Sequence, residues 1–177
     1  MTFDLEQTLR QLACTPPTLR AWLEDLPDHL ARANEGEGTW SAFDVVGHLV
    51  HGEKTDWVPR ARILLEHGEG MPFEPFDRFA QERDSVGKSL NELLDEFAVL
   101  RSASVDAVRD MRLTKSDLDR RGTHPEFGSV TLRQLLATWA THDLNHVYQI
   151  ARVLAAQRAD DVGPWKAYLG VLKTVRR

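Results

Sequence analysis

Apolar residues recur at helical spacing in four long segments of this chain, and no alternating pattern typical of strands competes with them. A stripe of apolar residues three or four positions apart marks the face of a helix that packs against a core. Because each helix must bury its stripe against the others, four of them in 177 residues predict an all-α four-helix bundle. The sequence shows no internal repeat, low-complexity tract or linker, so we expect a single domain over residues 1–177.

The first helical segment runs from about Leu5 to Leu26 and contains two adjacent prolines. Pro16 and Pro17 lack the N–H groups that a helix interior needs, which predicts a kink or two consecutive helices. Thr15 directly precedes the prolines and is able to cap the second of these helices.

The second segment begins after Trp40, where Ser41 and Asp44 have the spacing of a capping box with Asp in place of the usual Glu. The apolar stripe continues until about Gly68. Pro59 lies inside this stretch, so we expect one long helix that bends there.

The third and fourth segments also open with capping signals. The third begins at Ser89, with Glu92 at capping-box spacing, and continues to Val108, while the fourth extends from Thr131 to about Ala156. We expect a short C-terminal helix to follow, with Pro164 in its first turn and three apolar residues facing inward, namely Trp165, Leu169 and Leu172.

About twenty residues separate the second and third helical segments, which is long for a connection inside a compact domain. Phe73, Phe76 and Phe79 are spread along it, among prolines. Connections of this length are usually lids over a site or crossovers that span the fold. The sequence therefore predicts a bundle with one long crossover loop.

Charge and cysteine content restrict the partners and the compartment. The net charge is −5 and there is no long basic block, so we expect no nucleic-acid partner. No apolar run approaches the ~18 residues that span a bilayer, and the first residues do not form a signal peptide, so we expect no membrane partner. The single cysteine, Cys14, excludes an intrachain disulfide, which favours a cytoplasmic protein, and we interpret it as a small core residue.

Two histidines on the fourth segment are the strongest indication of chemistry. His142 and His146 lie four residues apart, so their imidazoles stack on one helix face and can reach one metal ion. They share the apolar stripe of that helix, where an unpaired polar ring is costly to bury. With His48 on an earlier helix, three nitrogens and an open position would form a catalytic zinc-type site. Asp143 stands where many zinc proteases have a glutamate base, which argues against protease chemistry.

Two more residues follow His48 on the same predicted helix. His51 lies about 60° around the helix from His48, so it could act as a ligand, as a support for a ligand, as a base, or as a solvated residue at the rim. Glu53 lies about 140° away, which makes joint ligation awkward and favours a role in orienting or neutralising a neighbour such as an arginine. We take His51 and Glu53 as the candidate catalytic proton acceptors.

Three short motifs together resemble a known family. Residues 40–41 read Trp-Ser, residues 47–49 read Gly-His-Leu, and residues 142–150 read His-Asp-x-x-His-x-x-Gln-Ile. In this order they resemble the DinB-like superfamily, and in particular its YfiT-like branch of metal-dependent hydrolases and bacterial thiol S-transferases. The resemblance extends over roughly residues 5–172. It implies a four-helix bundle with a rearranged helix order, often paired as a homodimer.

The resemblance also implies a site and an activity. It implies one divalent metal ion per chain, commonly zinc or nickel, held by His48, His142 and His146, whereas His51 departs from the acidic or small polar residue that is more usual in relatives. Some relatives transfer low-molecular-weight thiols such as mycothiol or bacillithiol to electrophiles, and others are described as hydrolases. We therefore expect a metal enzyme that activates a small-molecule thiol or water, and the alternative is a metal-stabilised binding or stress-response module without catalysis.

Overall fold

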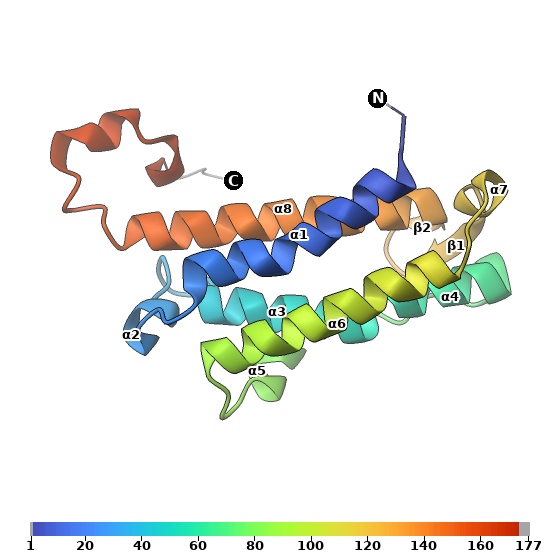
Figure 1. The fold of residues 1–177 in the computed structure, drawn as a ribbon, viewed down its shortest axis with the longest axis horizontal. Coiled ribbons are helices and arrows are strands. Elements are labelled where there is room, and N and C mark those ends of the chain that lie inside the picture. The colour runs from blue at the N-terminus through green and yellow to red at the C-terminus, as the bar shows by residue number, and fades with distance from the viewer. Residues whose placement is uncertain (1, 174–177) are drawn as a thin grey trace.

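The computed structural model describes residues 2–173, which form a four-helix bundle (Figure 1). Helices α1, α6 and α8 each supply one column of the bundle, and α3 and α4 together supply the fourth. In chain order the elements are α1 (Leu5–Leu23), α2 (Asp28–Ala31), α3 (Ala42–Thr55), α4 (Trp57–His67), η1 (Gly68–Gly70), α5 (Ala80–Asp84), α6 (Leu90–Asp110), α7 (Lys115–Leu118), β1 (Arg121–His124), β2 (Gly128–Thr131), α8 (Leu132–Ala156), η2 (Gly163–Tyr168) and η3 (Gly170–Leu172).

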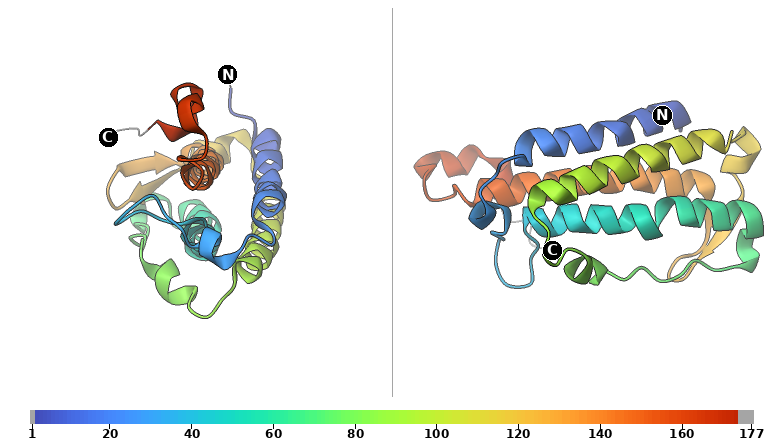
Figure 2. Two further views of the ribbon diagram at one scale, coloured as in Figure 1. Left: turned by 90° about the vertical axis from the view of Figure 1, so that its left-hand side faces the viewer. Right: turned by 60° about the horizontal axis from the view of Figure 1, so that its bottom comes forward.

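The order of the helices in space differs from their order in the chain. Both α1 and α3 pack against α6 and α8, so the first two long helices lie at diagonal corners (Figure 2). The α3–α4 column and α6 run in the same direction, and the chain must therefore return along the bundle between them (Figure 1). Residues 68–89 make this return, with α5 packed on α3. The predicted crossover and the rearranged helix order are both confirmed.

The starts of the long helices follow the predicted capping signals. Ser41 caps α3, Ser89 caps α6 and Thr131 caps α8, each through its side-chain oxygen and each in a reciprocal capping box. Each cap satisfies backbone N–H groups that have no partner inside the helix, and one such cap contributes about 1 kcal/mol. Local sequence therefore sets where three of the four columns begin.

Helix α1 continues through both prolines, so the prediction of two consecutive helices is wrong. Pro16 has no N–H to give the carbonyl of Leu12, four residues earlier. That carbonyl instead accepts a hydrogen bond from Arg101 Nη1 on α6 at 2.8 Å. Thr15 does not cap a helix, because its hydroxyl donates to a carboxylate on α8. A contact from another helix thus uses the acceptor that the proline leaves free.

The second predicted helix divides at Asp56 into α3 and α4 and does not simply bend at Pro59. Pro59 cannot donate to the carbonyl of Thr55, and its ring would clash with that carbonyl in a continuous helix. The break therefore falls one turn before the proline, and Pro59 lies in the first turn of α4, where its missing N–H costs little.

A β-hairpin that the sequence analysis did not predict precedes α8. Strands β1 and β2 pair antiparallel, with His124 opposite Gly128 across a three-residue turn. Gly128 has φ of +70°, a left-handed conformation that this kind of turn favours and that glycine adopts without strain. Each strand has only four residues, which is too short to show a clear alternation of apolar and polar residues.

Two predictions of burial were also wrong. A short helix does follow α8, the 3-10 helix η2 with Pro164 in its first turn, but the inward-facing residues expected there are not buried: Trp165 is 69% exposed, Leu169 is 38% exposed and Leu172 is only partly buried. Cys14 is exposed on the outer side of α1. Its apolar neighbours in sequence do not share its helix face, because successive residues of a helix point about 100° apart.

The core consists of two apolar clusters with polar side chains between them. One cluster includes Leu9 of α1 and Trp139 of α8, and the other includes Leu19 of α1 and Ile150 of α8. Between them along the helices lies a set of polar residues that we call the polar layer: the buried Thr15, His48, Glu53, Arg101, Asp143 and His146 and the partly buried His142. Burial of so many polar groups is costly unless they are paired or bind a ligand.

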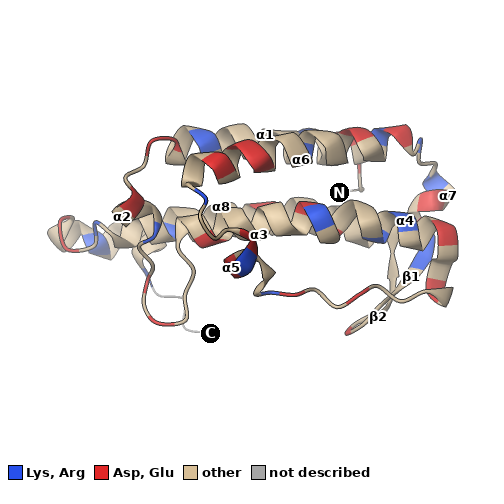
Figure 3. Ribbon diagram, turned by 90° about the horizontal axis from the view of Figure 1, so that it is seen from below, with Lys and Arg blue, Asp and Glu red and all other residues tan. Residues whose placement is uncertain are grey.

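Charged residues are distributed over several elements, with acidic and basic positions interspersed in the view of Figure 3. Among residues 2–173, the helices are too short or too polar to cross a membrane.

Candidate metal centre

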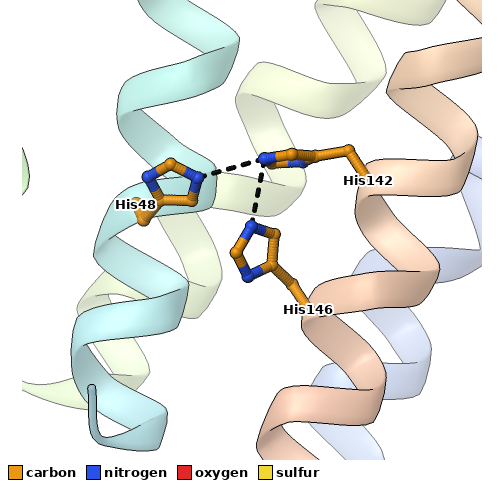
Figure 4. Close-up of side chains that lie close together, drawn as sticks. All are labelled: His48, His142 and His146. Atoms are coloured by element: carbon orange, nitrogen blue, oxygen red, sulfur yellow. Dashed lines mark hydrogen bonds between the residues drawn. The ribbon is translucent and has the colours of Figure 1, made fainter. Parts of the chain in front are cut away.

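Three imidazoles meet in the polar layer between α3 and α8. His48 comes from α3, and His142 and His146 come from successive turns of α8 (Figure 4). The Nε2 atom of His142 lies 3.1 Å from Nε2 of His48 and 3.0 Å from Nε2 of His146. One nitrogen from each ring lies within 4.8 Å of the other two, so a single metal ion could reach all three. The sequence-predicted ligands are thus brought together.

All three imidazoles are held in the neutral form. Burial, together with the neighbouring imidazoles, lowers the pKa of His48 to about 3 and that of His142 to about 2. Burial also lowers the pKa of His146. A neutral imidazole has the lone pair that a metal ion requires, so near pH 7 no proton has to be displaced before binding.

The imidazole nitrogens of the cluster cannot all be paired by hydrogen bonds to one another. Nδ1 of His146 lies 2.9 Å from Oε1 of Gln149, an acceptor, so this nitrogen donates and the Nε2 atom carries a lone pair. Nε2 of His142 faces two nitrogens but has at most one hydrogen to donate. Among the described residues, no partner reaches Nδ1 of His48 or of His142. Three imidazole nitrogens that converge but cannot all hydrogen-bond to one another suit a divalent metal ion.

Aromatic side chains enclose the cluster. The ring of Trp40 lies 4.8 Å from that of His48, and Phe76 from the crossover approaches the same imidazole at 5.4 Å. The ring of Trp57 meets that of His142 edge-on at 5.1 Å. These ring contacts limit the rotation of the imidazoles. The sequence analysis did not assign these aromatic residues to the site.

His51 lies beside the three-histidine cluster and not within it. It is buried, with Nδ1 3.5 Å from Oδ2 of Asp84 on α5 and its ring 5.1 Å from that of Phe76. The alternative of a solvated rim residue is therefore wrong. A histidine next to a carboxylate is the usual arrangement of a general base.

Glu53 has the arginine partner that its helix position suggested. Its Oε1 accepts from Nε of Arg101 at 3.0 Å, from Nη2 of Arg101 at 2.8 Å and from Nε1 of Trp139 at 3.1 Å. Oε2 of Glu53 is buried without a partner among residues 2–173. Arg101 was not among the predicted site residues. Its position in the apolar stripe of α6, four residues from both Phe97 and Val105, is a pattern that indicates a buried arginine with an acidic partner.

Asp143 faces Arg101 and is not part of the histidine cluster. Its Oδ1 accepts from Nη2 of Arg101 at 3.0 Å, and its Oδ2 accepts from Nη1 of Arg101 and from the hydroxyl of Thr15. The acidic residue of the His-Asp pair is therefore bound to a guanidinium, which agrees with the expectation that it does not serve as a protease-type base.

Comparisons with known proteins identify a family and two similar four-helix bundles. A family model described as the DinB superfamily matches residues 11–150. The fold resembles YfiT from Bacillus subtilis, described as a probable metal-dependent hydrolase with an unusual four-helix bundle topology, with TM-score 0.75, 20% identity, and 92% of this chain and 91% of that chain covered. It also resembles TT2238, a four-helix bundle protein, with TM-score 0.53, 21% identity, and 88% and 99% covered. A comparison with curated proteins gives no significant match.

Proposed function

The chain belongs to the DinB superfamily, and on this premise we propose that it is an enzyme that uses one divalent metal ion to act on a small molecule. The observation that carries the proposal is the convergence of three neutral Nε2 atoms from two helices. His48, His142 and His146 would hold the ion, and zinc or nickel is the ion we propose, because both accept imidazole ligands.

With three protein ligands and one open position, such an ion lowers the pKa of a coordinated water or thiol and so supplies a nucleophile near pH 7. The protein's own part is to orient the imidazoles. Trp40, Phe76 and Trp57 pack against the imidazoles and serve this purpose. His51, whose Nδ1 lies 3.5 Å from Oδ2 of Asp84, would accept the proton that the nucleophile loses.

Hydrolysis is supported by the description of YfiT as a probable metal-dependent hydrolase. Transfer of a low-molecular-weight thiol to an electrophile is the second candidate, and the state of the nearby carboxylates favours it. Glu53 and Asp143 are both bound to Arg101, so neither is free to activate water as a glutamate does in many zinc proteases. A thiol, with a pKa of about 8.5, needs less activation than water. We therefore propose His51 as the proton acceptor in place of Glu53.

The rival function is a metal-stabilised binding module without catalysis. Such a site would have every coordination position filled by protein, with His51 as the obvious fourth ligand. The contact of His51 with Asp84, and its position outside the three-nitrogen group, support an open site instead.

The first test is elemental analysis of untagged protein, of His48→Ala and of His142→Ala. We expect about one divalent ion per wild-type chain and none in either variant, and a folded wild type that neither contains nor takes up a divalent ion would overturn the proposal. The second test is a panel of activated esters and alkyl electrophiles, each assayed with and without an added thiol. Turnover without thiol supports hydrolysis, and turnover only with thiol supports transfer. The same preparation, examined by light scattering, tests the proposed homodimer.

A further inference from the structure

Arg101 occupies the centre of the polar layer and contacts all three other columns of the bundle. It is 1% exposed, and it donates to the carbonyl of Leu12 on α1, to Glu53 on α3 and to Asp143 on α8. The guanidinium makes five hydrogen bonds, which matches its five N–H groups. Every N–H of the guanidinium is therefore used, and these hydrogen bonds fix its position relative to the three helices.

The two carboxylates that bind Arg101 stand next to the metal-ligand positions. Asp143 directly follows His142 on α8, and Glu53 lies within two turns of His48 on α3. Arg101 therefore joins the two helices that carry the histidines at the level where the imidazoles meet. The Leu12 carbonyl, which Pro16 leaves without an N–H partner, accepts a further hydrogen bond from the guanidinium. This contact ties Arg101 to α1, the helix diagonal to α3.

Metal coordination requires more accuracy than helix packing alone provides. A slip of one residue along a helix moves a side chain by about 1.5 Å, whereas metal–nitrogen distances must agree to about 0.2 Å. We propose that Arg101 is a positioning residue of the metal site, because it fixes the register of α3 against α8 so that the three Nε2 atoms converge. This inference rests on the proposed metal-binding function.

A lysine at this position tests the inference with little change in charge. Lysine has three donors on one ammonium and cannot bridge two carboxylates and a carbonyl in the same plane. We expect Arg101→Lys to weaken zinc affinity on the order of 10- to 100-fold, the range found when groups that orient metal ligands are removed. Affinity is measured by competition with a chromophoric chelator, and the absorption spectrum of the cobalt-loaded protein reports the ligand geometry.

Arg60 offers a matched control. It is also a buried arginine, but it pairs with Asp56, the residue between α3 and α4, and donates to the carbonyl of Glu74 in the crossover. Arg60→Lys should lower the free energy of unfolding without a comparable change in zinc affinity or in the cobalt spectrum. Comparable losses of affinity in both lysine variants would mean that general loosening of the bundle is responsible, and would overturn the inference.

Glu53→Gln keeps the shape of the side chain and provides a second route if Arg101→Lys does not fold. We expect it to weaken zinc affinity in the same direction and to shift the cobalt spectrum. Wild-type affinity in a folded Arg101→Lys or Glu53→Gln protein would refute the positioning role, and so would tighter binding, which would mark Arg101 as a charge that repels the ion. Failure of the wild type to bind either zinc or nickel would instead refute the proposed function, so the two failures are distinguishable.

Discussion

The polar layer contains two clusters that share helices and burial but differ in how their polar atoms are paired. In the arginine cluster, formed by Arg101, Glu53 and Asp143, every N–H of the guanidinium has an acceptor. In the histidine cluster, Nε2 of His142 faces two nitrogens with at most one hydrogen to donate, and Nδ1 of His48 and of His142 has no partner within the described chain. The first arrangement holds the helices together by itself, whereas the second needs an ion.

The two clusters interlock because adjacent residues of a helix point in different directions. His142 joins the histidine cluster, and Asp143, about 100° further around α8, joins the arginine cluster. The His142-Asp143 pair therefore supplies a proposed metal ligand and, in the next residue, the carboxylate that binds α8 to Arg101. If this division is correct, variants in the arginine cluster should lower the stability of the metal-free protein more than variants in the histidine cluster do. Variants in the histidine cluster should in turn have the larger effect on metal affinity.

The largest expected effect on stability belongs to the arginine cluster. Arg101→Met leaves two carboxylates buried without their cation, and breaking a buried ion pair in this way costs about 3–5 kcal/mol. Urea denaturation of metal-free protein measures this loss. A loss below about 1 kcal/mol would show that water or protonation replaces the guanidinium, and the comparison between the clusters would then fail.

Metal should stabilise the folded chain through the histidine cluster. At a free zinc concentration 100 times the dissociation constant, binding to the native state alone adds about 2.7 kcal/mol to the free energy of unfolding. We expect thermal unfolding of the wild type to shift upward with added zinc and that of His142→Ala to remain unchanged. An equal shift in both proteins would place the stabilising metal at another site.

Without metal, the histidine cluster should contribute little to stability. His142→Leu removes an imidazole whose Nδ1 has no partner in the described residues and replaces it with an apolar side chain of similar size. We expect the free energy of unfolding of the metal-free protein to stay the same or to rise by about 1 kcal/mol. A loss of several kcal/mol would mean that the imidazoles pack as a structural unit without an ion, and the contrast between the two clusters would then fail.

The same contrast explains what the sequence could predict. The pair His142 and His146 was predictable because spacing of four residues on a helix is local information. The arginine cluster was not predictable in detail, because Arg101 pairs with residues 48 and 42 positions away in sequence. The helix position of Glu53 did indicate an arginine partner, but nothing local identified which one.

The errors in the fold have related causes. The capped starts of α3, α6 and α8 follow from short-range capping motifs and were predicted correctly, whereas the division of the second predicted helix at Asp56 was not. The prolines of α1 were misjudged because Arg101, a distant residue, uses the carbonyl that Pro16 leaves free. The hairpin before α8 has strands of four residues, which are too short for a periodic signal to stand out.

The smallest predicted effect concerns a single hydrogen bond at the edge of the arginine cluster. Thr15 donates from α1 to Oδ2 of Asp143, an oxygen that also accepts from Arg101. Thr15→Val keeps the volume but removes this one donor, so we expect a loss of about 1 kcal/mol in the free energy of unfolding. Thr15→Ser, which keeps the hydroxyl, is the matched control and should retain more of the hydrogen-bond contribution. Because Asp143 keeps both hydrogen bonds to the guanidinium, zinc affinity should change by less than it does in Arg101→Lys; an equal drop would assign the positioning to Thr15 and α1.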